Sequence, residues 1–269
     1  MYCRLTALAL SSTLTIALGA TSARAIIERS VESEQGNRRR MVNYLFLEEI
    51  NRKAFDRKGR QVSETVQAHE VLFIEGRPAF RRTSIDGRPL TADEERAERA
   101  RLRQLAEDRR QNPQAPSGAE ERRRAHPFQR FLDLHDFELS GEETMDGREC
   151  WLIESKPRRK TKPRDNDDRR IAGSTARFWI DKETLHRVRM DVTALKPSGP
   201  GHVRESTSYR WAPRDGTVWL ITSIQTVLPL SGKNNDYAWY EGQQTYSRYR
   251  RFLSESTISG VEEADATRD

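Results

Sequence analysis

The sequence predicts a mainly β protein of the α+β class, in which a strongly curved antiparallel sheet forms an incomplete β-barrel with covering helices. About nine or ten runs of the chain are rich in β-branched and aromatic residues, as strands are. Short turn sequences such as Glu75-Gly76, Asp86-Gly87 and Asp146-Gly147 join most of these runs, which favours antiparallel hairpins. Helical patterns occur at only two places, near residue 30 and near the middle of the chain.

The chain begins with a segment typical of a secretory signal peptide. A positively charged start containing Arg4 precedes an apolar run from Leu5 to about Ala20, and Ala23-Arg24-Ala25 places alanine at the two positions that signal peptidase reads. The alternative is a membrane anchor, but the run is shorter than the roughly 20 apolar residues of a span and contains several hydroxyl side chains. We therefore expect residues 1–25 to be a signal peptide cleaved after Ala25 and the protein to be exported to the periplasm.

The first half of the remaining chain predicts a short helix followed by a meander. Residues 26–40 suit an amphipathic helix, and residues 42–50, 61–74 and 79–85 form extended runs separated by turns. A helical insertion then covers about residues 91–133. It opens on a capping box formed by Thr91 and Glu94, and the charged helix behind it has little apolar surface, so it should be largely solvated. A second short helix is predicted after Pro127.

The second half returns to strands. Extended runs are predicted at residues 137–144, 150–153, 175–181, 186–192, 204–211, 218–228 and 237–252, and the segment from Lys156 to Ser174 reads as a flexible basic loop. Because side chains alternate along a strand, Phe178 should share a face with Ile180, and Val188 should share a face with Met190. Cys150 is the one cysteine left after cleavage, and its strand-like surroundings predict a buried thiol. One domain should cover residues 26–254, and residues 255–269 should form a polar tail.

The sequence lacks the common motifs of catalysis and metal binding. The five histidines are scattered without metal-ligand spacing, and neither a nucleophile elbow nor a Gly-rich phosphate loop occurs. We therefore expect a protein that is not an enzyme and has no cofactor or metal. The arginine clusters lack interleaved aromatic residues, and export argues against nucleic acid as a partner. These clusters are interpreted as a solvated surface or, alternatively, as contacts to an anionic membrane surface.

The hairpin from Phe178 to Val192 carries a family resemblance. Its sequence Phe178-Trp179-Ile180-Asp181-Lys182-Glu183-Thr184, with the alternating run that follows, resembles the corresponding hairpin of LolA/LolB-like envelope proteins. The order of the elements around it, from Gly76-Arg77-Pro78 to the run 245–252, resembles uncharacterised exported bacterial proteins of that outer-membrane lipoprotein-sorting superfamily. The resemblance implies a half-barrel with a helical lid over an apolar cavity, and a carrier or binder of lipid or lipoprotein acyl chains.

Apolar side chains of the strands are the candidate ligand-binding residues. Each of them can be a wall of an apolar cavity or an ordinary part of the core, and the sequence leaves both readings open. The eight candidates are Phe46, Phe73, Phe178, Ile180, Val188, Met190, Trp219 and Tyr246. An alternative function uses the same half-barrel as an interaction or stress-sensor module, whose partner is an envelope protein.

Overall fold

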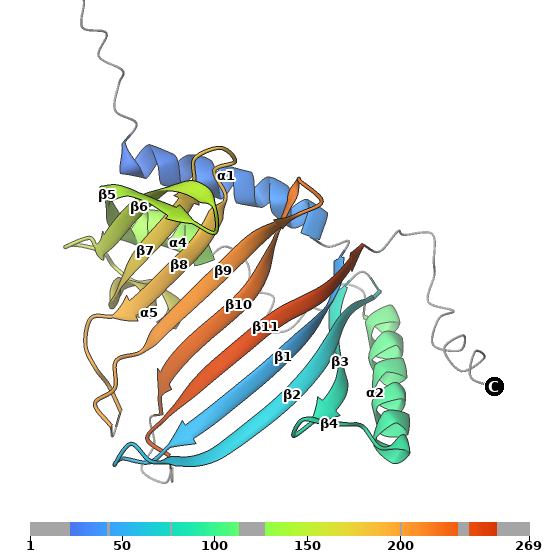
Figure 1. The fold of residues 1–269 in the computed structure, drawn as a ribbon. Coiled ribbons are helices and arrows are strands. Elements are labelled where there is room, and N and C mark those ends of the chain that lie inside the picture. The colour runs from blue at the N-terminus through green and yellow to red at the C-terminus, as the bar shows by residue number, and fades with distance from the viewer. Residues whose placement is uncertain are drawn as a thin grey trace, which may run out of the picture.

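Antiparallel strands form one open, curved sheet in the computed structural model, which describes residues 22–41, 44–75, 77–112, 127–199, 201–230 and 237–251 (Figure 1). The strand order is β4-β3-β2-β1-β11-β10-β9-β8-β7-β6-β5. The strands are β1 (Tyr44–Phe55), β2 (Gln61–Ile74), β3 (Arg77–Ile85), β4 (Arg88–Pro89), β5 (His135–Met145), β6 (Arg148–Pro157), β7 (Ser174–Asp181), β8 (Arg187–Ala194), β9 (Ser206–Arg214), β10 (Val218–Pro229) and β11 (Trp239–Arg251).

This architecture confirms the predicted fold class. The predicted strand runs, about nine or ten, lack only β4, a two-residue strand that pairs with the end of β3. β4 and β5 lie at opposite edges of the sheet, so the barrel is incomplete. Most of the proposed signal peptide and the whole of the polar tail at residues 255–269 fall outside the described residues.

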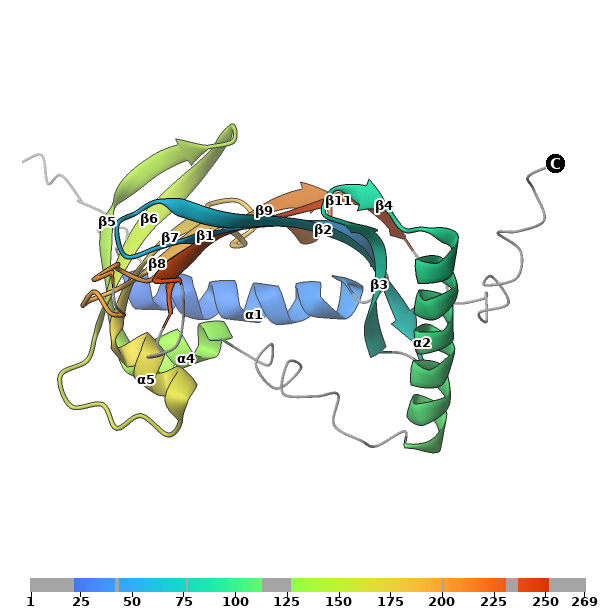
Figure 2. The ribbon, with the colours of Figure 1, turned by 90° about the horizontal axis from the view of Figure 1, so that it is seen from below.

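Four described helices accompany the sheet: α1 (Ala23–Met41), α2 (Ala92–Gln111), α4 (Pro127–Leu134) and α5 (Asn166–Ala172). The sheet arches over α1, which contacts β5, β7 and β10, while α4 packs beside α1 (Figure 2). At the other end of the sheet α2 contacts β2 and β3. We call the face toward α1 the concave face. Within the described residues no helix is both long and apolar enough to cross a bilayer.

The largest cluster of buried apolar residues lies on the concave face, between α1, α4 and strands β6 to β8. α1 contributes Ile26 and Ile27, which are 1% and 0% exposed, and α4 contributes Phe128 and Phe131. A second cluster joins Cys150, Leu152, Trp179, Val188 and Trp219. Cys150 is a free, fully buried thiol whose pKa is raised to about 11 by burial, which confirms the predicted buried thiol.

Val188 and Met190 do not share a face, which corrects the prediction from strand alternation. Met190 packs in the α1 cluster with Phe178, whereas Val188 packs in the second cluster with Trp179. The reason is an irregular register between β7 and β8, where Ile180 pairs with Arg187 and the alternation is shifted by one residue. A β-bulge of this kind reverses the side-chain parity beyond it.

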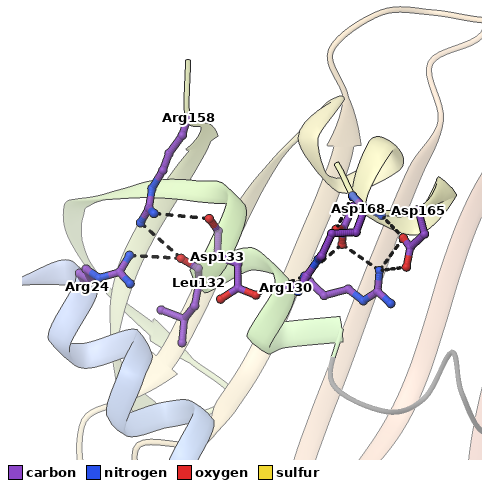
Figure 3. A network of polar contacts seen from close by, with 8 residues as sticks. Arg24, Arg130, Leu132, Asp133, Arg158, Asp165 and Asp168 are labelled. Carbon is purple, nitrogen blue, oxygen red and sulfur yellow. Dashed lines mark hydrogen bonds and ion pairs between the residues drawn. The ribbon is translucent and has the colours of Figure 1, made fainter. Parts of the chain in front are cut away.

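The predicted flexible loop after Lys156 contains a helix and a buried ion cluster instead. Asp165 caps α5 by accepting a hydrogen bond from the backbone nitrogen of Asp168. Asp168 has no exposed surface and pairs with Arg130 of α4, as Figure 3 shows. It also pairs with Arg164. Arg164 of this segment and Arg130 of α4 therefore neutralise the buried Asp168 carboxylate. These ion pairs order a segment whose many charges had suggested a flexible loop.

Helix α2 forms as the sequence predicts. The Thr91 hydroxyl accepts from the Glu94 backbone nitrogen, and the Glu94 carboxylate accepts from the Thr91 backbone nitrogen at 2.8 Å. None of its residues is buried, so the helix is solvated as expected.

Candidate functional site

Three of the eight predicted site residues lie in the packed core. Phe178 and Ile180 are 0% exposed and Met190 is 5% exposed. The Phe178 ring lies 5.2 Å from Phe128 and 5.6 Å from Phe131, measured between ring centroids. These side chains contact α4 and α1, so in this structure helices occupy the place that the prediction gave to a ligand.

Val188 and Trp219 belong to the second buried cluster, and Trp219 is joined to α1. The Asn37 side chain of α1 donates to the Trp219 carbonyl at 2.6 Å and accepts from the Trp219 nitrogen at 2.8 Å. The His186 ring lies against the Trp219 indole and within hydrogen-bond distance of the Ser33 hydroxyl. Burial lowers the pKa of His186 to about 4, so its ring is neutral at pH 7.

The remaining three predicted residues are half-buried. Phe46 on β1 and Tyr246 on β11 have ring centroids 5.7 Å apart. Phe73 lies on β2, two residues from Val71, the direct partner of Phe46, and pairs with Pro78 of β3. The structure therefore brings Phe46 and Tyr246 together, apart from the five residues in the buried clusters.

Strand register identifies the neighbours of Phe46 and Tyr246. Residues that pair directly across strands lie on the same face, and the pairs Met190–Tyr209, Tyr209–Ile224 and Ile224–Gln244 carry the concave face from β8 to β11. By the same alternation Leu228 and Tyr240, which pair directly, share this face. We call these half-buried concave residues of the central strands the open rows: Phe46, Ile224, Leu228, Tyr240 and Tyr246.

The sequence analysis missed three of the open-row residues. Ile224, Leu228 and Tyr240 lie within strands that were predicted, but their sequence contains no sign of which face meets the helices. Exposure alternates here in the structure, since Gln225, Glu241 and Gln243 on the outer face are exposed. A strand register, which one sequence does not contain, would have been needed to find them.

A polar ladder crosses the concave face beside the open rows. The pairs Tyr246–Glu48, Glu48–His69 and His69–Arg82 run across β11, β1, β2 and β3. Glu48 is only 7% exposed, and its Oε2 lies 3.9 Å from His69 Nδ1. Burial is the main cause of the lowered pKa of His69, and the Arg82 charge lowers that pKa further.

The ladder ends in a cavity of about 260 Å³ beneath α2. Its lining residues are His69, Phe80, Arg82, Glu98 and Arg101. Glu98 of α2 accepts from the Arg82 backbone nitrogen at 3.0 Å and pairs with Arg101 at 2.5 Å, while Arg101 also donates to the Phe80 carbonyl. None of these residues was predicted as a site, because α2 reads in the sequence as a solvated helix.

At the opposite end, a buried cation fixes the two helices to the sheet. The Arg187 guanidinium lies over the rings of Phe128 and Trp211, at 4.2 Å and 4.5 Å from their centroids. It also pairs with Glu34 of α1. This arrangement compensates a cation that is only 8% exposed.

Further polar contacts join α1, α4 and α5 (Figure 3). Arg24 of α1 donates to the Leu132 carbonyl at 3.2 Å, and Arg158 donates to the same oxygen at 3.3 Å. Arg24 precedes the predicted cleavage point after Ala25, so cleavage there would remove this contact and the first residues of α1.

The described residues contain no group of three or more His, Cys, Asp or Glu side chains that could hold a metal ion. What they do contain is a partly accessible apolar surface, the open rows, and a small cavity with polar walls next to it. Such a combination suits binding of an amphiphilic molecule.

Comparison with known proteins identifies similar solved structures. No family model matches the chain, and no curated protein matches it. A DUF1329 family protein from Desulfovibrio piger is 15% identical, with 87% of this chain and 95% of that chain covered and a TM-score of 0.36. An outer membrane lipoprotein-sorting protein domain from Vibrio parahaemolyticus is 11% identical, with 90% and 100% covered and a TM-score of 0.36.

A LolA superfamily protein from Nitrosomonas europaea is 11% identical, with 88% of this chain and 96% of that chain covered and a TM-score of 0.32. Identities and TM-scores this low assign neither a ligand nor an activity to this chain. Among solved structures the chain is similar to proteins of the LolA superfamily, which the sequence also resembles.

Proposed function

We propose that this protein is a non-enzymatic, exported binder of lipid or of lipoprotein acyl chains, and that it holds the chain against the open rows. The observation that carries the proposal is that five apolar or aromatic side chains on the concave face of β1, β10 and β11 are half-buried rather than packed in the core. They lie between the strands under α1 and the strands under α2.

An alkyl chain would gain free energy on this surface without any catalytic group. Burial of each methylene contributes about 0.8 kcal/mol. The aromatic members add polar edges, because the Tyr246 hydroxyl donates to Gln244 at 2.9 Å. A surface that is apolar along the strands and polar at its margin suits a molecule with a chain and a polar head.

Native mass spectrometry of the gently purified full-length protein tests this proposal. We expect co-purifying acyl species with the unmodified protein and their loss in Ile224→Lys, which places a charge in the open rows. Gln225→Lys is the matched control, because the neighbouring residue is exposed on the outer face of the same strand. An unmodified protein without acyl species, or an Ile224→Lys protein that keeps them, would refute the proposal.

The second candidate function is an interaction or sensor module for an envelope protein. One observation favours it: β5 is an edge strand of the sheet, and it exposes 44% of Leu139. An edge strand has unpaired backbone groups that can bind an extended peptide. A clean apo mass in the experiment above, with an envelope peptide captured at β5, would support this module instead.

A further inference from the structure

The cavity beneath α2 has an uneven charge balance. Arg101 is neutralised by Glu98, whose two carboxylate oxygens accept from it at 2.5 Å and 2.9 Å. The Arg82 guanidinium makes no hydrogen bond or ion pair with any described residue, although its backbone nitrogen donates to Glu98. The Arg82 charge acts on Glu98, whose pKa it lowers, so the cavity wall holds two cations that share one carboxylate.

A second polar group in the same wall also lacks a hydrogen bond. His69 Nδ1 is buried and has no hydrogen-bond partner among the described residues. The nearest carboxylate oxygen, Glu48 Oε2, lies 3.9 Å away, beyond hydrogen-bond distance. A buried nitrogen without a partner is costly, so its presence in a cavity wall points to a ligand atom.

The position of the cavity connects it to the open rows. Phe80 in its wall pairs with Val71 on β2, and Val71 pairs with Phe46 on β1. This row of apolar residues runs on the concave face from the cavity to the Phe46 and Tyr246 rings. The cavity volume of about 260 Å³ is below the usual size of a complete ligand site, so it suits one group of a larger molecule.

We propose that this cavity is an oxyanion subsite, in which Arg82 and His69 bind the phosphate group of an amphiphile whose chain lies along the open rows. The subsite rests on the proposed function, because the chain is the cargo of that function. A guanidinium can donate two parallel hydrogen bonds to a phosphate, and a neutral imidazole can donate one. Phe80 then contacts the first methylenes of the chain.

The test compares dodecyl phosphate with dodecyl maltoside, both as monomers, by isothermal titration calorimetry. The two probes share the alkyl chain and differ in the charge of the head group. We expect the phosphate to bind about tenfold to hundredfold more tightly, as charge-assisted hydrogen bonds imply. Arg82→Gln should remove this preference and leave dodecyl maltoside binding unchanged, and Arg82→Lys should keep part of it.

Arg81→Gln is the matched control. Arg81 is the neighbouring residue on β3, faces the outer side and pairs there with Glu70 at 3.2 Å. This variant should retain the full preference for the phosphate. Equal affinity of the unmodified protein for both probes, or an unchanged preference in Arg82→Gln, would overturn the subsite.

Inorganic phosphate alone separates the subsite from the proposed function. If neither dodecyl probe binds, the lipid proposal fails. If inorganic phosphate then binds the unmodified protein but not Arg82→Gln, the result still supports an oxyanion site, which free phosphate fills. If inorganic phosphate also fails to distinguish the two proteins, the subsite is refuted.

The NMR titration of the His69 ring gives a readout that a purely structural role would not change. A bound phosphate places negative charge beside the ring, and the pKa of His69 should therefore rise when dodecyl phosphate is added. The charged groups that already act on the ring are Arg82, Arg52, Arg101, Glu98 and Glu48. An unchanged His69 titration with saturating dodecyl phosphate would contradict direct contact.

Discussion

The two parts of the concave face are built differently. In the covered end, which comprises β5 to β8 with α1 and α4, apolar side chains reach complete burial and aromatic rings interlock. In the open part, which comprises β1 to β3, β10 and β11 with α2, the side chains of the open rows stay half-buried, although Ile50 and Val71 on the same face are buried. We infer that the covered end supplies most of the stability, which leaves the open part available to a ligand.

Charges follow the same division. Arg187 and Asp168 at the covered end are buried, and each is paired with an opposite charge from a neighbouring element. In the open part the guanidinium of Arg82 is exposed and makes no hydrogen bond or ion pair with a described residue. A buried charge must be compensated for the fold to persist, whereas an exposed unpaired cation costs little and can await a ligand.

The largest expected effect is a difference in stability between two phenylalanine variants, one in each part of the concave face. Phe178→Ala should lower the free energy of unfolding by about 3–5 kcal/mol, because it leaves a cavity beneath α4. Phe46→Ala should cost only about 1 kcal/mol, because the Phe46 side chain is already partly in water. Urea denaturation followed by circular dichroism measures both. Similar losses in the two variants would break the division of the concave face.

A second test uses pH at the covered end. The pKa of His186 is lowered from 6.5 to about 4, mainly by burial and then by the charge of Arg40. The unfolded chain therefore takes up a proton at a higher pH than the folded protein does. Neutral His186 contributes up to about 3 kcal/mol to the free energy of unfolding. This contribution is fully present above pH 6.5 and is lost as the pH falls toward 4.

The variant His186→Gln isolates this contribution. Glutamine can still hydrogen-bond to Ser33 but does not titrate, so the loss of unfolding free energy between pH 7 and pH 4 should be smaller than in the unmodified protein. His202→Asn, at an exposed position, should keep the original pH dependence. Parallel pH profiles for the unmodified protein and His186→Gln would contradict the buried, neutral ring.

A third test concerns the attachment of α1. Asn37→Ala leaves the Trp219 nitrogen and carbonyl without their side-chain partner at a buried position. Unsatisfied buried groups of this kind cost about 2 kcal/mol in total. Chemical denaturation should show this loss, and Gln35→Ala, at an exposed position of the same helix, should show almost none. Equal losses of unfolding free energy in the two variants would mean that Asn37 does not anchor α1.

The strands could be predicted from the sequence, but the contacts between them could not. The alternation in residues 175–181 and 218–228 and the capping box at Thr91 are local patterns, and the structure has the corresponding elements. The shifted parity of Val188 depends on a bulge against β7, and the burial of Asp168 depends on Arg130 from another helix. The first depends on the exact register within one hairpin and the second on a helix residue 38 positions away along the chain, and local composition encodes neither.

The candidate site divides in the same way. Phe46 and Tyr246 were predicted because they are aromatic residues in strands, and the structure places them together. Their partners in the open rows and the cavity at Arg82 emerge only when the register of five strands and the docking of α2 are known. An aromatic residue in a strand was therefore too broad a criterion, because Phe178 and Trp219 also meet it and are packed in the buried clusters.

The smallest expected effect concerns α2, which contacts the open part without burying any residue. Thr91→Ala removes half of the capping box and should cost about 1 kcal/mol or less. Because α1 is anchored by Asn37 and α2 is held by exposed polar contacts, this loss should remain local. Hydrogen exchange followed by mass spectrometry should show faster exchange in residues 92–111 and no change in residues 23–41. Arg103→Ala, exposed on the same helix, is the control. If exchange accelerates equally in α1, then α2 is part of the same cooperative unit and the open part is not energetically separate from the covered end.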